Sequence, residues 1–102
     1  MHLSIETRES LKKEIVAGLS GFSEVRRIVI FGSFVDSEDP HDLDLAVFQD
    51  SGEGYYPLAM KYRRKLRGVA RKIPLDVIPI RREAGEGPFL EEVGKGEVVY
   101  EG

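Results

Sequence analysis

The sequence has 102 residues, a length that predicts one domain over residues 1–102 with a single compact core. Apolar residues make up 41% and charged residues 32%, which is typical of a folded domain and excludes a disordered chain. The absence of cysteine excludes a disulfide framework, a thiolate metal site and a cysteine nucleophile. No apolar run approaches the roughly 18 residues of a membrane span, and the charged N-terminal residues are unlike a secretion signal. We therefore expect a cytoplasmic protein with no membrane partner.

The first half of the chain predicts one helix and two strands. Residues 4–19 predict a helix, because apolar residues recur there at four-residue spacing: Leu11, Ile15, Leu19. Residues 25–31 predict a strand whose continuous apolar run indicates burial on both faces. The polar residues 32–41 predict a turn or a short irregular helix, and residues 43–48 predict a second strand.

The second half predicts a long helix over residues 55–72, then a strand over 75–80 and a glycine-rich loop over 81–87. The helix carries an apolar stripe: Leu58, Tyr62, Leu66, Val69, Ile73. A short helix over 88–94 and a short strand over 98–100 follow. This order favours an α+β fold in which a mixed β-sheet packs its helices on one face and leaves the other face open for a ligand.

Basic residues are concentrated in residues 61–82. This segment has nine basic residues and one acid, a net charge of +8, whereas the rest of the chain has six basic and seventeen acidic residues, a net charge of −11. On charge alone, the solvated face of an amphipathic helix is the favoured interpretation. The alternative is a cationic wall that faces a polyanion such as a triphosphate or a nucleic acid. No aromatic stacking platform or nucleic-acid motif accompanies the charge, which argues against nucleic acid as a partner.

Three aspartates stand out on the predicted strands. Asp42 and Asp44 are two residues apart and point to the same face, while Leu43 and Leu45 point to the opposite, helix-covered face. Asp76 interrupts the apolar run of the third strand. If the two strands are neighbours, the three carboxylates converge on the open face.

Such a cluster favours a metal site. Two unit charges about 4 Å apart repel by roughly 4 kcal/mol at an effective dielectric constant near 20. Mg²⁺ is the usual cation of a carboxylate site that also receives substrate phosphates. The alternative is that Asp42 closes a turn, Asp44 is solvated and Asp76 pairs with a basic neighbour. That alternative needs three separate coincidences.

Gly32 and Ser33 follow the first strand directly, and Ser33 precedes Asp42 by nine residues. A Gly-Ser pair at the end of a strand offers backbone N–H groups and a hydroxyl that can hold phosphate oxygens. The alternative is a tight turn at Gly32 with Ser33 as a cap.

The combined pattern, residues 31–33 (Phe-Gly-Ser), residues 42–45 (Asp-Leu-Asp-Leu) and the strand residue Asp76, resembles the minimal nucleotidyltransferases of the DNA polymerase β-like superfamily. The resemblance extends over nearly the whole chain, because helix, strand, Gly-Ser, Asp-x-Asp, helix and strand occur in the order of the family. It implies the polymerase β-like nucleotidyltransferase fold.

The resemblance also implies roles for individual residues. Gly32 and Ser33 match the motif that holds the β- and γ-phosphates of the nucleotide. Asp42 and Asp44 match the pair that binds two Mg²⁺ ions, for which Mn²⁺ can substitute, and Asp76 matches the third metal-binding and catalytic carboxylate, which helps to activate the attacking hydroxyl. The implied reaction is attack on the α-phosphate of an NTP, with ATP as the expected substrate and pyrophosphate as the leaving group.

The sequence departs from the family pattern at two places. Many members follow Gly-Ser with Ala-Arg-Gly, where this chain has residues 35–37 (Val-Asp-Ser), and the usual Ser before the first metal-binding aspartate is His41. The extra acid, Asp36, is expected to weaken affinity for a triphosphate, whereas His41 is interpreted as a polar turn residue.

The resemblance further implies a protein partner. Minimal members are often encoded beside a small helical protein of the HEPN type and act as its antitoxin by attaching AMP to it, which implies a hetero-oligomer and allows a homodimer. A rival hypothesis is a binding module that neutralises such a partner by contact alone, through Tyr55, Tyr56 and the basic helix. A nucleic-acid binder that uses the basic helix ranks third.

Overall fold

The computed structural model describes residues 2–102, and its elements follow the predicted order. They are α1 (Ile5–Leu19), β1 (Val25–Phe31), α2 (Ser33–Asp36), β2 (Leu43–Gln49), α3 (Tyr55–Lys65), α4 (Arg67–Lys72), β3 (Leu75–Arg81), α5 (Pro88–Gly94) and β4 (Glu97–Glu101). The strands form one sheet in the order β3-β2-β1-β4. β1 is antiparallel to β2 and β4, and β3 is parallel to β2, so the predicted mixed sheet and α+β class are confirmed.

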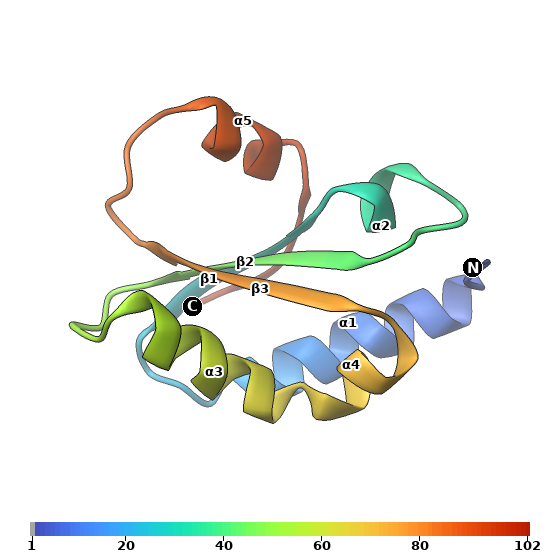
Figure 1. Cartoon of the computed structure of the whole chain (residues 1–102), viewed down its shortest axis with the longest axis horizontal. Coiled ribbons are helices and arrows are strands. Elements are labelled where there is room, and N and C mark those ends of the chain that lie inside the picture. Colours follow the sequence, from blue (N-terminus) through green and yellow to red (C-terminus); the bar gives the residue numbers. More distant parts are fainter. Residues whose placement is uncertain (1) are drawn as a thin grey trace.

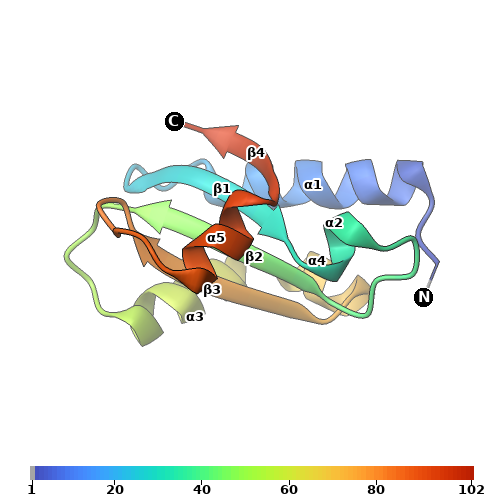
Figure 2. The same cartoon turned by 90° about the horizontal axis from the view of Figure 1, so that it is seen from above.

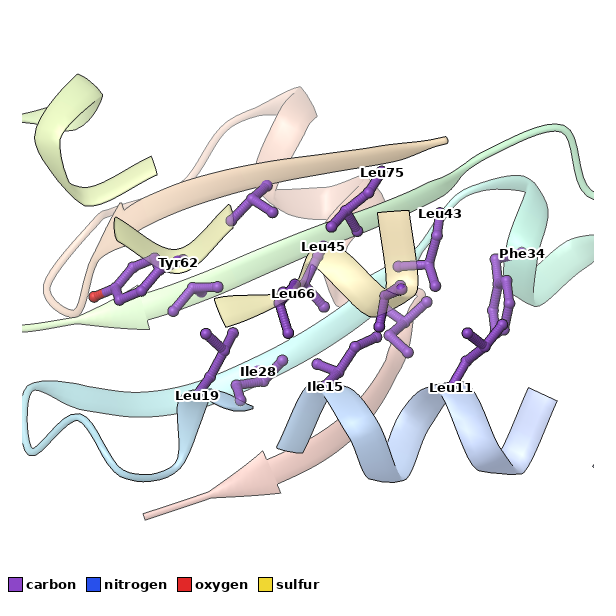
Figure 3. Close-up of a cluster of buried hydrophobic side chains, with 14 of the residues drawn as sticks. Leu11, Ile15, Leu19, Ile28, Phe34, Leu43, Leu45, Tyr62, Leu66 and Leu75 are labelled. Atoms are coloured by element: carbon purple, nitrogen blue, oxygen red, sulfur yellow. The ribbon is translucent and has the colours of Figure 1, made fainter. Parts of the chain in front are cut away.

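The main core lies between the sheet and the helices α1, α3 and α4, which all cover one face (Figure 1). Leu43 and Leu45 point into this core from β2 and are fully buried. Figure 3 shows how side chains from the helices meet those from the strands: Leu11, Ile15, Leu19, Ile28, Phe34, Tyr62, Leu66, Leu75. Full burial of each such side chain contributes about 1.5–3 kcal/mol, so this layer holds β2 and its aspartates in place.

The predicted helix over residues 55–72 is two helices. Leu66 has φ −114° and ψ 25°, which ends α3 and precedes α4. Its backbone N–H bonds to the carbonyl of Arg63, three residues back, and its side chain stays fully buried. The apolar stripe therefore continues across the break, because a single tighter turn leaves Leu58 and Val69 on the same buried side.

The second face of the sheet is covered in part, where we expected it to be open. α5 crosses over this face, as the view from above shows (Figure 2). Val93 of α5 packs into a second apolar cluster with Val29, Phe48 and Ile80 from the strands. The expectation was wrong for this part of the face because residues 88–94 carry too few apolar positions for their burial to be read from periodicity.

Within residues 2–102, no helix combines the length and the apolar character needed to cross a bilayer.

Candidate active site

The pairing of β2 with β3 brings two of the predicted aspartates together. Asp44 and Asp76 are partners in the parallel register. Neighbouring strands lie about 4.8 Å apart, and residues in register point to the same face of the sheet. Because Leu43 and Leu45 are buried on the helix-covered face, Asp44 and Asp76 lie on the opposite one, as the alternation in the sequence predicts.

The third predicted carboxylate, that of Asp42, is tied to the Gly-Ser turn. Asp42 directly precedes β2, and its Oδ1 accepts a hydrogen bond of 3.1 Å from the hydroxyl of Ser33. The structure therefore places the predicted phosphate-binding hydroxyl beside the predicted metal-binding carboxylate. Residues nine positions apart in the sequence meet because α2 turns the chain back at the end of β1 (Figure 1).

Gly32 has a conformation that only glycine adopts readily. Its φ is 78° and its ψ is −152°. Among the described residues, it is the one whose φ lies in the left-handed region that favours glycine. A Cβ atom at this position would lie 2.5 Å from Oδ2 of Asp44. The absence of a side chain thus lets the backbone of the turn approach the carboxylate of Asp44 closely.

The electrostatics of the cluster are consistent with this proximity. Burial raises the pKa of the Asp44 carboxyl, and the negative charges of Asp42 and Asp76 raise it further. Asp44 is half-buried, whereas Asp76 is exposed. Although Asp76 interrupts an apolar run, its carboxylate carries no cost of burial, because β3 is an edge strand and leaves that side chain in solvent.

The alternative roles of these aspartates find limited support. Within the described part of the chain, Asp76 forms no ion pair with a basic residue at 4.0 Å or less, so the salt-bridge interpretation of Asp76 fails. Asp36 and His41, the two departures from the family pattern, are both exposed. Asp42 does help to close the turn through Ser33, which is compatible with a second role as a ligand.

The three carboxylates fit Mg²⁺ only in combination with a substrate. Among residues 2–102, no group of three or more His, Cys, Asp or Glu side chains is arranged so that it could hold a metal ion by itself. Mg²⁺, however, is commonly held by one or two carboxylates together with substrate phosphates and water. The oxygen ligands of Asp42 and Asp44 beside the open turn at Gly32 suit that mode of binding.

Sequence reasoning missed Arg8, which holds the phosphate-side turn in place. Its guanidinium donates hydrogen bonds to the carbonyls of Phe34, Ser37 (2.7 Å) and Glu38 (3.1 Å), and it stacks over the Phe34 ring at 5.1 Å. A signal was present in the sequence, since Arg8 lies three residues before Leu11 and thus in line with the apolar stripe of α1.

The family model described as "Polymerase beta, Nucleotidyltransferase" matches residues 13–102. The chain belongs to the polymerase β-like nucleotidyltransferases. The matched residues of this nucleotidyltransferase domain include the Gly-Ser turn and all three aspartates, so the predicted superfamily and fold are confirmed. No curated protein matches the sequence. The minimal subfamily, the substrate and the partner remain predictions.

Proposed function

We propose that this nucleotidyltransferase moves a nucleotidyl group, AMP from ATP, to the hydroxyl of an acceptor in a Mg²⁺-dependent reaction. The observation that carries this function is the in-register pairing of Asp44 with Asp76, with Asp42 and the Gly32 turn next to them. The reaction consumes a nucleoside triphosphate, and the proposed site of action is accordingly the cytoplasm.

The residues divide the work of an in-line displacement. Gly32 and Ser33 hold the β- and γ-phosphates, and Asp42 and Asp44 hold the metal, for which Mn²⁺ can substitute. Bound Mg²⁺ would neutralise the carboxylates and stabilise charge on the attacking and leaving oxygens. Asp76 accepts the proton of the acceptor hydroxyl. The acceptor oxygen bonds to the α-phosphorus while the bond from that phosphorus to the pyrophosphate oxygen breaks. The exposure of Asp76 supports this role, because an acceptor can reach it.

The proposed acceptor is a protein, in keeping with a small helical partner of the HEPN type and a toxin-antitoxin pair. A second candidate function, neutralisation by contact alone, is favoured by one observation. Tyr55, Tyr56 and Met60 of α3 are 50%, 79% and 53% exposed, which leaves an aromatic and apolar surface available to a partner. A homodimer through the same surface is the other assembly that the proposal allows.

Transfer is tested by incubating the protein with each of the common NTPs, Mg²⁺ and the product of the neighbouring gene, followed by mass spectrometry of that product. We expect the mass of one nucleotidyl group on the partner, strongest with ATP, and none with Asp44→Asn. Asp50→Asn at the other end of β2 is the matched control and should transfer as the wild type does. Transfer by Asp44→Asn at the wild-type rate, or no transfer with any NTP while the partner is still neutralised, would contradict the proposed chemistry.

A further inference from the structure

Three arginines of α3 and α4 line a hollow beside the edge of the sheet. We name it the arginine edge. Its volume is ≈ 210 Å³, and its lining residues are Met60, Arg63, Arg64, Arg67, Ala70 and Leu75. The arginines are exposed, and Met60 and Ala70 supply an apolar wall. The hollow therefore combines concentrated positive charge with apolar surface.

The size of this hollow bears on what it can hold. At ≈ 210 Å³ it has less than half the volume of the hollow beneath α5, which measures ≈ 550 Å³. Pockets for whole small-molecule ligands usually span about 300–1,000 Å³. The arginine edge is thus suited to a few side chains of a larger partner and is too small for a nucleotide.

Two guanidinium groups of the arginine edge have no ion-pair partner among residues 2–102. Lysines of the same helices do pair with acids, since Lys61 Nζ lies 2.9 Å from Glu24 and Lys72 Nζ lies 3.3 Å from Glu14. By contrast, no carboxylate oxygen of residues 2–102 forms an ion pair with Arg64 or Arg67. Two exposed guanidinium groups are therefore available to a carboxylate from outside, which they can bind in a bidentate manner.

The arginine edge also contacts the residue that precedes the proposed catalytic aspartate on β3. Arg63 Nη1 donates a hydrogen bond of 3.1 Å to the carbonyl of Leu75, the residue before Asp76 on β3. α4 leads directly into this edge strand (Figure 1). A partner that touches the arginines from outside can pass around the edge of the sheet and bring a hydroxyl to Asp76, which is exposed on the opposite face.

We propose that the arginine edge docks the acceptor protein through a short acidic segment next to the hydroxyl that is modified. This docking role rests on the proposed transferase function and adds the chemistry by which the acceptor is chosen. Carboxylates of the acceptor pair with Arg64 and Arg67, and an apolar side chain contacts Met60, which is 53% exposed.

A short acidic segment suits this surface better than a nucleic acid does. The basic segment 61–82 carries a net charge of +8, but the rest of the domain carries −11, so a long polyanion would be repelled where it leaves the arginine edge. The neighbouring aromatic rings of Tyr55 and Tyr56 pack edge to face on each other, with centroids 5.5 Å apart, and do not form a row on which successive bases could stack.

Binding of labelled peptides, measured by fluorescence anisotropy, tests the docking role without ATP. The probes are a short peptide with one tyrosine among glutamates and versions in which glutamine or lysine replaces the glutamates. We expect the glutamate peptide to bind about tenfold more tightly than the glutamine peptide, as two or three exposed ion pairs allow. This preference should vanish near 1 M salt, where the Debye length is about 3 Å.

A charge reversal identifies the surface. In Arg64→Glu/Arg67→Glu the preference should invert, so that the lysine peptide binds more tightly than the glutamate peptide. The matched control Lys13→Glu/Lys95→Glu makes the same change in net charge at exposed positions on α1 and after α5, and it should keep the wild-type preference. Equal binding of the three peptides by the wild type, or inversion in the control as well, would overturn the docking role. The docking role would also be overturned if the wild type bound a single-stranded oligonucleotide more tightly than the glutamate peptide and the charge-reversal variant lost that binding.

Failure of the docking role can be distinguished from failure of the proposed transferase function by measuring Mg²⁺-ATP binding. Mg²⁺-ATP binding by the charge-reversal variant should equal that of the wild type, because no residue of the arginine edge belongs to the nucleotide site. A wild type that binds no Mg²⁺-ATP but prefers the acidic peptide would refute the transferase and leave the docking surface standing. A wild type that binds Mg²⁺-ATP without preferring the acidic peptide would refute the docking role alone.

Discussion

Replacing Gly32 by alanine tests the close approach between the turn and β2. The φ of 78° and ψ of −152° place Gly32 in a region that is essentially restricted to glycine, and a side chain there costs about 1–3 kcal/mol. For a domain of this size, each kcal/mol lowers Tm by about 4–8 °C. A mid-range cost of about 2 kcal/mol therefore predicts a Tm about 8–16 °C lower, on the basis of the backbone alone.

The contact with Asp44 adds a second contribution to the destabilisation by Gly32→Ala, and a double-mutant cycle measures this contribution separately. The new Cβ would lie 2.5 Å from Oδ2 of Asp44, so the carboxylate must move. In an Asp44→Ala background this obstacle is absent, and Gly32→Ala should cost less by about 0.5–3 kcal/mol, the range for residues in contact. The backbone component should persist in both backgrounds.

Thermal unfolding followed by circular dichroism gives the change in Tm, and urea unfolding gives the free energy of unfolding of each variant. Gly21→Ala is the matched control, because no atom lies within 4 Å of its added Cβ, and its Tm should stay near that of the wild type. A Gly32→Ala protein with the wild-type Tm would refute the strained conformation. An equal cost in both backgrounds would refute the contact with Asp44.

Three further predictions concern other parts of the domain. Burial acts to raise the pKa of Glu24, but the hydrogen bond from Lys61 and the other partners of Glu24 outweigh burial and lower that pKa. The carboxylate of Glu24 therefore stabilises the fold above its ordinary pKa of 4.5, and this stabilisation is lost as the pH falls through the pKa of the folded state. Glu24→Gln should flatten the acid limb of a plot of Tm against pH, and an unchanged limb would contradict the pairing of Glu24 with Lys61. Arg8→Ala should reduce amide-exchange protection in α2 and the residues after it but not in β1, as measured by mass spectrometry, whereas equal protection would show that Arg8 does not hold the turn. Asp76→Asn should abolish transfer. Its Tm should be unchanged or higher, because the substitution removes one of the negative charges that raise the pKa of Asp44. A destabilised but active variant would show that the role of Asp76 is structural.

The alternation along β2 made the orientation of the aspartates predictable from the sequence. Leu43 and Leu45 must face the core, and Asp44 between them must then face away. The same alternation cannot show that Asp44 and Asp76 are partners in the sheet. Their pairing depends on the register between β2 and β3, which the crossover through α3 and α4 and the packing of both helices determine.

Other features depend on contacts that a single sequence does not encode locally. The break at Leu66 leaves the apolar periodicity of residues 55–72 intact, so the pattern alone reads as one helix. α5 is held on the second face by few side chains, among them Val93 and the edge-to-face pair of Phe89 with Phe31 at 5.7 Å. Both arrangements are set by tertiary packing, which overrides local propensity.

Calorimetric titration of ATP into the protein, with Mg²⁺ and then with a chelator, tests most directly whether Asp42, Asp44 and the Gly32-Ser33 turn form a metal-dependent nucleotide site. Binding should be clear with Mg²⁺ and weaker by at least about tenfold with the chelator, since the carboxylates and the phosphates repel each other without a cation. Asp42→Asn/Asp44→Asn should remove the dependence on Mg²⁺. Equal affinity with Mg²⁺ and with the chelator in the wild type would contradict the metal-dependent site, and with it the proposed transferase.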